Sequence, residues 1–340
     1  MLALVVGLLA LFLHNVDLWR VASEIVRARP EWLALSLLTM FVNLAIRAWR
    51  WQFLLEPLGG TTFGNAFRAT AVGFAATSVL PARAGEVIRP YFLARSERRH
   101  QGMSATGAFA TIILERVLDA VTVLVLLASF VFVFGREYGV TNPTAIAAVK
   151  WAGGLAGVVA AGALVAMFVL AGDPERFGRV MTRLGQILPS ALAGLIARVV
   201  EKFARGLGAI RRPGRLVISL LLSFPLWLCI CLGTWAMARA FGLDVPFTGS
   251  FLLTAILVLG VAVPTPGAVG GFHEALRVGL TVFFGAADDS AVAAAILLHL
   301  FSIGPSLLLG LLFAAQAGLN FAGMRRMADQ AQQAQRGHTA

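Results

Sequence analysis

Apolar positions along this chain gather in runs that are long enough to cross a membrane. About 20 helical residues span the ~30 Å hydrocarbon core of a bilayer. Such runs lie at residues 32–53, 106–134, 147–171, 215–241 and 291–315. A further apolar segment, Met1–Leu13, has neither a basic start nor a small-residue cleavage site, so we expect a helix there and not a signal peptide. The pattern predicts an all-α polytopic membrane protein.

The segment between the third and fourth of these runs has a helical pattern of apolar and basic residues. Leu192, Leu195, Ile196, Val199, Phe203, Leu207 and Ile210 recur at helical spacing. Arg198, Lys202 and Arg205 gather on another face, which predicts a basic amphipathic helix on the cytoplasmic leaflet; a solvated connector is the alternative. The expected organisation is a first membrane half (1–171), a cytoplasmic loop (172–214), a second membrane half (215–317) and a cytoplasmic polar tail (318–340).

The two membrane halves share a sequence pattern. Aligning Trp51 with Trp235 also matches Phe63 with Phe247, Phe67 with Phe251, Thr70 with Thr254, and Glu115 with His299. In each copy the apolar stretch before a proline is too short to cross a bilayer alone. We therefore expect broken or re-entrant helix segments at 67–95 and 251–283. The helix-breaking residues are Pro81, Gly85, Pro264, Pro266, Gly267 and Gly270.

Three full crossings precede the second copy, so the repeat is expected to be inverted. Paired, interrupted helices in two inverted halves are typical of transporters with a substrate site near the bilayer midplane. Irregular backbone at that depth persists only where protein or a water-filled cavity satisfies its polar groups. The pattern therefore predicts a site between the two breaks.

Composition agrees with this assignment. Hydrophobic residues make up 59% of the chain and charged residues 13%, with a mean hydropathy of +0.82. The net charge of +11 lies in loops beside apolar runs, where it sets orientation and contacts anionic lipid, so no nucleic-acid partner is expected. Residues 83–100 and 176–215 and both termini are predicted to be cytoplasmic, and 135–142 and 242–249 external. Residues 17–31 are ambiguous.

Charged residues recur after each break and inside one span. Glu86 and Arg89 follow the first break, and Glu274 and Arg277 follow the second, each as E-x-x-R. Span 106–134 carries Glu115, Arg116 and Asp119, with Glu115 roughly 14 Å from its start. An ionisable side chain at that depth costs about 2.5 to 3.5 kcal/mol and normally faces a partner or a cavity.

Two interpretations of these charges stay open. In one, Arg116 and Asp119 form a salt bridge between helices, and Glu86 with Arg89 only marks a helix start. In the other, arginines and helix N-termini bind an anionic group such as phosphate or carboxylate. The second interpretation gives as substrate-binding candidates Arg83, Glu86, Arg89, Glu115, Arg116 and Asp119, with His273, Glu274 and Arg277 from the opposite side.

The sequence contains few indications of a metal or cofactor site. His273 and His299 belong to no H-E-x-x-H motif or Cys/His cluster, and Cys229 and Cys231 are two apart on one helix and point in different directions. No nucleophile-elbow, Walker A or dinucleotide motif is present. We expect no metal, no cofactor and no disulfide.

Four motifs carry a family resemblance. "RWQFLL" (50–55), "LPARAGEVIR" (80–89), "LERVLD" (114–119) and "PTPGAVGGFHEA" (264–275) resemble the flippase-like membrane domain of the lysylphosphatidylglycerol synthase family. The resemblance covers nearly the whole chain and implies a multi-pass inner-membrane protein that handles lipids or lipid-linked precursors. No segment that resembles the soluble aminoacyl-transferring domain of full synthases follows the last expected span in this sequence, so we do not expect lipid aminoacylation. An acid or His follows G-x-F in that family, which makes both His273 and Glu274 candidates.

The leading hypothesis is a lipid translocase for an anionic lipid or lipid-linked substrate. A membrane enzyme that modifies a headgroup, with Glu86 or Glu115 as general acid or base, is an alternative. A non-catalytic partner of a soluble transferase, docked on the amphipathic helix, is another. The expected partners are membrane lipids with an anionic headgroup, and a homo-oligomer stays open.

Overall fold

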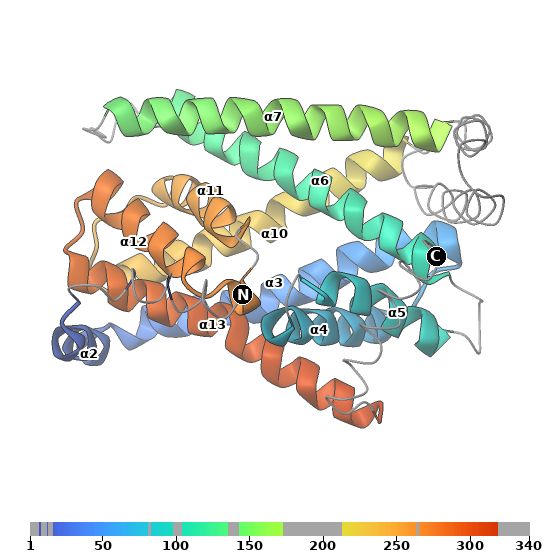
Figure 1. Cartoon of the computed structure of the whole chain (residues 1–340), viewed down its shortest axis with the longest axis horizontal. Coiled ribbons are helices and arrows are strands. Elements are labelled where there is room, and N and C mark those ends of the chain that lie inside the picture. The colour runs from blue at the N-terminus through green and yellow to red at the C-terminus, as the bar shows by residue number, and fades with distance from the viewer. Residues whose placement is uncertain are drawn as a thin grey trace.

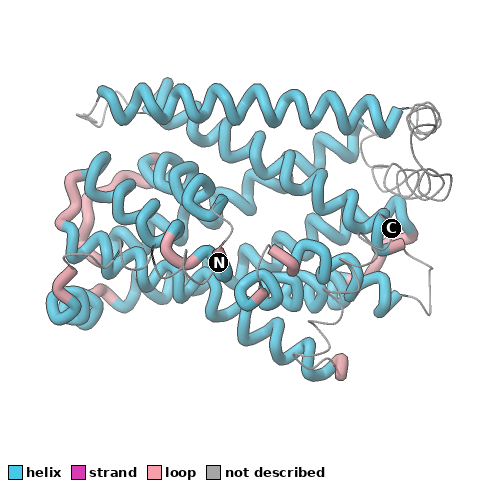
Figure 2. The backbone as a smooth tube through the Cα atoms, viewed as in Figure 1, coloured by secondary structure: helices cyan, strands magenta, loops and turns pink. Residues whose placement is uncertain are grey.

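The computed structural model describes residues 7, 12, 16–80, 83–97, 104–134, 143–172, 213–262 and 265–318, and this part of the chain is helical without strands (Figures 1 and 2). The helices are α2 (Leu18–Arg27), α3 (Pro30–Leu55), α4 (Phe63–Val79), α5 (Gly85–Glu97), α6 (Ala105–Ser129), α7 (Pro143–Gly172), α10 (Pro213–Ala240), α11 (Gly249–Ala262), α12 (Gly271–Phe284) and α13 (Asp288–Gln316). Short helical turns lie at Glu56–Leu58, Phe130–Phe134 and Pro266–Ala268. The expected all-α fold is confirmed.

Four of the described helices are long and apolar enough to cross a membrane, namely α3, α6, α10 and α13. They correspond to the expected spans at 32–53, 106–134, 215–241 and 291–315. The remaining expected span falls on α7, which runs alongside α6 at the top of Figure 1. The chain is therefore a membrane protein with several apolar helices.

Helix α2 lies in a segment that the sequence pattern left without a structure. The Asp17 side chain accepts hydrogen bonds from the backbone N–H groups of Trp19 and Arg20 and so caps the helix start. Val21 is its buried residue, whereas Trp19 is 87% exposed. The helix packs against α13.

The order of elements is the same in the two halves. In each half a long helix is followed by two short helices around a break and then by another long helix: α3, α4, α5, α6 and α10, α11, α12, α13. The short pairs match the expected segments 67–95 and 251–283. Helix α3 packs along α10, and α4 packs along α13. The inversion of the repeat and the re-entrant course of the short pairs stay predictions.

Local chemistry explains where the short helices begin and end. The Thr62 side chain caps α4 by accepting from the Asn65 N–H, and α4 ends where Leu80 turns extended. In the second half, Gly267 and Gly270 have φ of 59° and 86°, left-handed values that favour glycine. The predicted breakers Pro81 and Pro264 lie outside the described residues, as do the predicted amphipathic helix and most of the polar tail.

Helices α4 and α5 approach each other closely. A Cβ added at Gly85 would overlap the Gly73 carbonyl oxygen and the Thr77 side chain. Trp51, which is fully buried, packs in the same core as Ile88 and Leu93 of α5. Small residues thus let the first hairpin pack tightly, as is usual between helices in membranes, and this fixes the side chains that follow the break.

Candidate functional site

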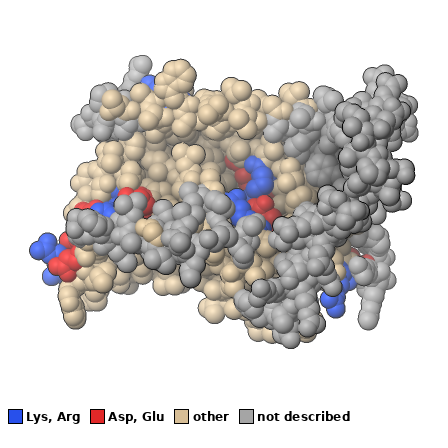
Figure 3. All heavy atoms as spheres, viewed as in Figure 1, with Lys and Arg blue, Asp and Glu red and all other residues tan. Residues whose placement is uncertain are grey.

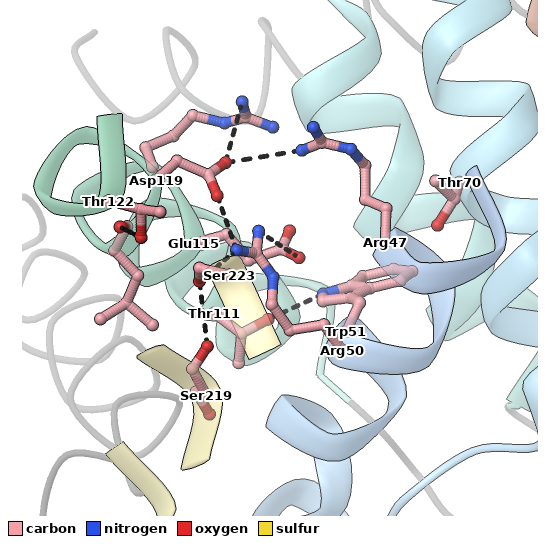
Figure 4. Close-up of polar contacts among 12 residues, drawn as sticks. Arg47, Arg50, Trp51, Thr70, Thr111, Glu115, Asp119, Thr122, Ser219 and Ser223 are labelled. Atoms are coloured by element: carbon pink, nitrogen blue, oxygen red, sulfur yellow. Dashed lines mark hydrogen bonds and ion pairs between the residues drawn. The ribbon is translucent and has the colours of Figure 1, made fainter. Parts of the chain in front are cut away.

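Asp119 on α6 lies at the centre of a buried ion-pair cluster (Figure 4). It accepts a hydrogen bond of 2.6 Å from Arg50 Nη1 and a weaker one of 3.5 Å from Arg47 Nη1, both on α3. Arg116 Nη1 lies 3.7 Å from the same carboxylate, and Trp227 Nε1 on α10 donates to it at 3.0 Å. The Asp119 carboxylate therefore forms ion pairs with three guanidinium groups.

Glu115 lies one helical turn before Asp119 and is fully buried. Its carboxylate accepts from Arg50 Nη2 at 3.3 Å and from Arg89 Nη1 at 2.8 Å. The Arg89 guanidinium also lies 3.8 Å from the ring centroid of Trp51, a cation–π contact. Glu115 thus joins α3, α5 and α6, which explains how an acid is accommodated inside an apolar helix.

Glu86 extends the cluster toward the first break. Its carboxylate lies 3.6 Å from Arg116 Nε and 3.9 Å from Arg83 Nη1, and all three side chains are partly exposed. The ion pairs described above join eight residues, which we call the charged network: Arg47, Arg50, Arg83, Glu86, Arg89, Glu115, Arg116 and Asp119. The structure therefore brings together all six candidates from the first half.

A cavity with two connected chambers lies against this network. The chamber beside the two breaks has a volume of about 260 Å³ and is called the polar chamber. The other has a volume of about 510 Å³ and more aliphatic lining, and is called the apolar chamber, although Arg47 and Asp119 also line it. Both are lined by Phe74, Arg83, Arg116, Val261, Phe272, Ser302 and Ser306. Figure 3 shows basic and acidic side chains in a hollow near the middle of one face, next to uncharged surface, while other charged side chains lie toward the edges of the view. Part of the charged network thus borders open space.

The two helix breaks meet at the polar chamber. Arg83 of the first break donates a hydrogen bond of 2.7 Å to the Val261 carbonyl at the end of α11. A Cβ added at Gly267 of the second break would lie 3.3 Å from the Ser78 carbonyl oxygen of α4. Arg83 and Ala268 both have positive φ, 52° and 56°. Such backbone strain in non-glycine residues gathers at functional sites.

Two histidines lie behind the second break. His273 Nδ1 accepts from the Gly270 N–H at 3.3 Å, and His299 Nε2 lies 2.7 Å from the Gly267 carbonyl oxygen. Their ring centroids are 4.3 Å apart, although sequence spacing gave no reason to pair them. Within the described part of the chain no group of three or more His, Cys, Asp or Glu is arranged to hold a metal. The His273 side chain thus stabilises the backbone of the second break through its hydrogen bond with Gly270.

Glu274 and Arg277 form a separate cluster. Arg277 makes two hydrogen bonds to the Asp288 carboxylate, at 2.6 and 2.7 Å, and one of 3.0 Å to the Phe12 carbonyl oxygen. Glu274 lies 3.7 Å from Arg277, and neither residue lines the cavity. The sequence predicted that Glu274 and Arg277 bind the substrate from the second half, but in this arrangement they lie away from the cavity.

Sequence reasoning missed two members of the charged network, Arg47 and Arg50. Both lie in the expected span 32–53 and are buried. Ionisable residues inside an apolar span need an interior partner, so the signal was present in the "IRAWRWQ" segment. Their partners, however, could be identified only once α3 was seen beside α6.

Comparisons with known proteins agree with the motifs. A family model described as the lysylphosphatidylglycerol synthase TM region matches residues 1–310. This range contains the two breaks, the charged network and all four motifs. A comparison with curated proteins gives no match. The family match thus covers nearly the whole chain, including the candidate site.

Proposed function

Because the chain belongs to the lysylphosphatidylglycerol synthase TM-region family, whose description fits a membrane protein of lipid metabolism or transport, we propose that it is a lipid translocase. It moves an anionic lipid or lipid-linked substrate across the cytoplasmic membrane, with both termini on the cytoplasmic side. The observation that supports this most directly is the cavity that lies between two helix breaks and is bordered by Arg83 and Arg116. Such a cavity is typical of transporter substrate sites.

The charge of the site favours an anionic headgroup. Arg47 and Arg89 line the cavity with side chains that are only 7% and 5% exposed, and each retains a buried N–H group without a hydrogen-bond partner. Buried donors are normally satisfied. These donor atoms have almost no accessible surface in this arrangement. Phosphate or carboxylate oxygens in the cavity would accept their hydrogen bonds once the two side chains turn toward the ligand, and binding would then complete the polar contacts of the site.

The two chambers differ in a way that suits a lipid. The polar chamber is bordered by arginines and by hydroxyl groups such as Thr77 and Thr265. The apolar chamber is bordered by residues that include Leu44, Val123 and Leu257. A headgroup in the first chamber would leave the second for the start of an acyl or polyprenyl chain.

The enzyme alternative fits the geometry less well. A general acid or base must exchange a proton with the substrate. Glu115 is fully buried and accepts from two arginines, and Glu86 lies between Arg83 and Arg116. Glu115 therefore has no exposed surface at which to meet a substrate, and arginines lie against both carboxylates. The docking surface of the partner alternative lies outside the described residues, and nothing further favours it.

Reconstituted proteoliposomes test the proposal. The purified protein is placed in vesicles with headgroup-labelled anionic or zwitterionic lipids, and a membrane-impermeant quencher reports how much label has changed leaflet. We expect transfer of anionic lipid by the unchanged protein and by Arg239→Gln, whose arginine pairs with Asp244 away from the cavity. Transfer should fall strongly in Arg116→Gln and Glu86→Gln.

Two results would contradict the proposal. If Glu86→Gln, Arg116→Gln and Asp119→Asn transfer lipid at the unchanged rate, the site is wrongly assigned. If no lipid moves and mass spectrometry instead finds a chemically altered headgroup, the protein is an enzyme.

A further inference from the structure

The charged network has more positive than negative members. Its five guanidinium groups belong to Arg47, Arg50, Arg83, Arg89 and Arg116, and its three carboxylates to Glu86, Glu115 and Asp119. The difference is two positive charges. No charged residue outside the network lines either chamber in the described part of the chain. Arg47, Arg50 and Arg89 are buried, and Arg83 and Arg116 are partly exposed at the cavity. Uncompensated charge is costly where water is excluded, so a ligand with about two negative charges would balance the site.

The two buried carboxylates are already paired with guanidinium groups. Asp119 is shared by Arg47, Arg50 and Arg116, and Glu115 by Arg50 and Arg89. Glu86 is partly exposed and lies 3.6 Å from Arg116 and 3.9 Å from Arg83. An ammonium group, as in an ethanolamine or aminoacyl headgroup, would have to displace a guanidinium group at Asp119 or Glu115, and at Glu86 it would meet two arginines. The network therefore disfavours zwitterionic and cationic headgroups.

The arginines that line the cavity hold buried guanidinium N–H groups without a hydrogen-bond partner. These are Arg47 Nε, Arg89 Nε and Arg89 Nη2, whereas Arg116 Nε has only the 3.6 Å ion pair with Glu86. The hydroxyl groups that line the polar chamber instead donate to backbone carbonyls, as Thr77 does to Gly73 and Ser302 to Leu298. Guanidinium groups bind phosphate oxygens with matching geometry. Recognition of the ligand thus depends on arginine and on the charge of the ligand.

We infer that the cavity selects a headgroup with two or more negative charges, such as a terminal phosphate or a diphosphate, over a phosphodiester with one. This inference rests on the proposed function and specifies its substrate class. A terminal phosphate has a second pKa of about 6 and is close to doubly charged at pH 8. Its charge would balance the excess of the network, whereas a phosphodiester would leave one guanidinium uncompensated.

Binding to the purified full-length protein in detergent tests the inference. The probes are phosphatidic acid and phosphatidylglycerol with identical acyl chains, a polyprenyl diphosphate, and inorganic pyrophosphate. At pH 8 we expect phosphatidic acid and the diphosphate lipid to bind about tenfold more tightly than phosphatidylglycerol. Lowering the pH to 5 should remove the preference for phosphatidic acid, because its phosphate then carries one charge, and leave phosphatidylglycerol binding nearly unchanged.

The variants change the charge excess directly. Arg83→Gln and, independently, Arg116→Gln reduce the excess from two to one, so each should abolish the preference for the doubly charged headgroup. Arg239→Gln is the matched control and should keep it. Inorganic pyrophosphate should compete with the lipids if the phosphate chemistry alone is recognised, and competition only by lipids would place part of the selectivity in the apolar chamber. Both results support a doubly charged phosphate ligand.

The inference fails separately from the proposed function. If phosphatidylglycerol binds as tightly as phosphatidic acid at pH 8, and is translocated in an Arg116-dependent way, the protein is a translocase without the proposed charge selectivity. If phosphatidic acid is preferred but no lipid is translocated, the binding inference holds and the translocase proposal is wrong.

Discussion

The Arg83 guanidinium in the first helix break is hydrogen-bonded to the Val261 carbonyl oxygen in the second half, at 2.7 Å. The acceptor lies in the last turn of α11, where unpaired carbonyl groups carry partial negative charge that a cation stabilises. The two residues are 178 positions apart in the sequence. This contact ties the breaks together across the cavity, so substrate binding at Arg83 would be felt directly by the second half.

Removal of the Arg83 link is expected to destabilise the fold moderately. Arg83→Met should lower the free energy of unfolding by about 1 kcal/mol, because a partly exposed hydrogen bond to a backbone carbonyl is lost. Thermal unfolding can be followed with a thiol-reactive dye, since Cys231 is buried in the folded protein. Arg239→Met is the control, and equal melting temperatures for both variants would argue against the link.

A methyl group at Gly85 is expected to force α4 and α5 apart. The added Cβ would overlap the Gly73 carbonyl oxygen, and overpacking of this kind typically costs about 1 to 3 kcal/mol. Gly64→Ala on α4 is the matched control, because nothing lies within 4 Å of its added Cβ. Gly85→Ala should therefore melt earlier and translocate less, while Gly64→Ala should match the unchanged protein. A stable, fully active Gly85→Ala protein would refute the close contact.

Loss of the Asp119 charge is expected to be severe. Asp119→Asn leaves Arg47, Arg50 and Arg116 without their shared carboxylate, and removal of one partner from a buried ion pair costs about 3 to 5 kcal/mol. Size-exclusion profiles and melting curves in detergent measure the effect. Asp244→Asn changes an exposed carboxylate and should behave as the unchanged protein. Similar stability of the two variants would mean that Asp119 is not the centre of the network.

Contacts within one helix could be predicted from the sequence, because helical spacing fixes them. Arg116 and Asp119 do form the expected pair at three-residue spacing, at 3.7 Å. The partners of Glu115 could not be predicted in this way. Arg50 and Arg89 reach it from 65 and 26 residues away, and only the packing of α3 and α5 against α6 brings them there. The Arg116–Asp119 ion pair agrees with the salt-bridge interpretation, and the ligand interpretation stays a prediction.

The second half shows why a sequence repeat does not guarantee a repeated site. Each half carries an E-x-x-R pair after its break, Glu86–Arg89 in the first and Glu274–Arg277 in the second. Arg89 finds Glu115 on the next long helix, but the position that aligns with Glu115 holds His299. Arg277 has no carboxylate there and instead pairs with Asp288 at the start of α13. The residue aligned with Glu115 is thus different in the second half, and the arginine of the second E-x-x-R pair has a different carboxylate partner.

The predicted inversion of the two halves is testable through single cysteines. In a Cys229→Ala, Cys231→Ala background, Arg95→Cys probes the end of α5 and Asp244→Cys the connection before α11, both exposed positions. The positive-inside rule places basic segments on the cytoplasmic side, so a membrane-impermeant maleimide should label Asp244→Cys but not Arg95→Cys in intact cells. Both should react after lysis. Labelling of both positions from the same side would mean that the two hairpins enter the membrane from one face and that the halves are parallel, because an inverted repeat must present these equivalent hairpins to opposite compartments.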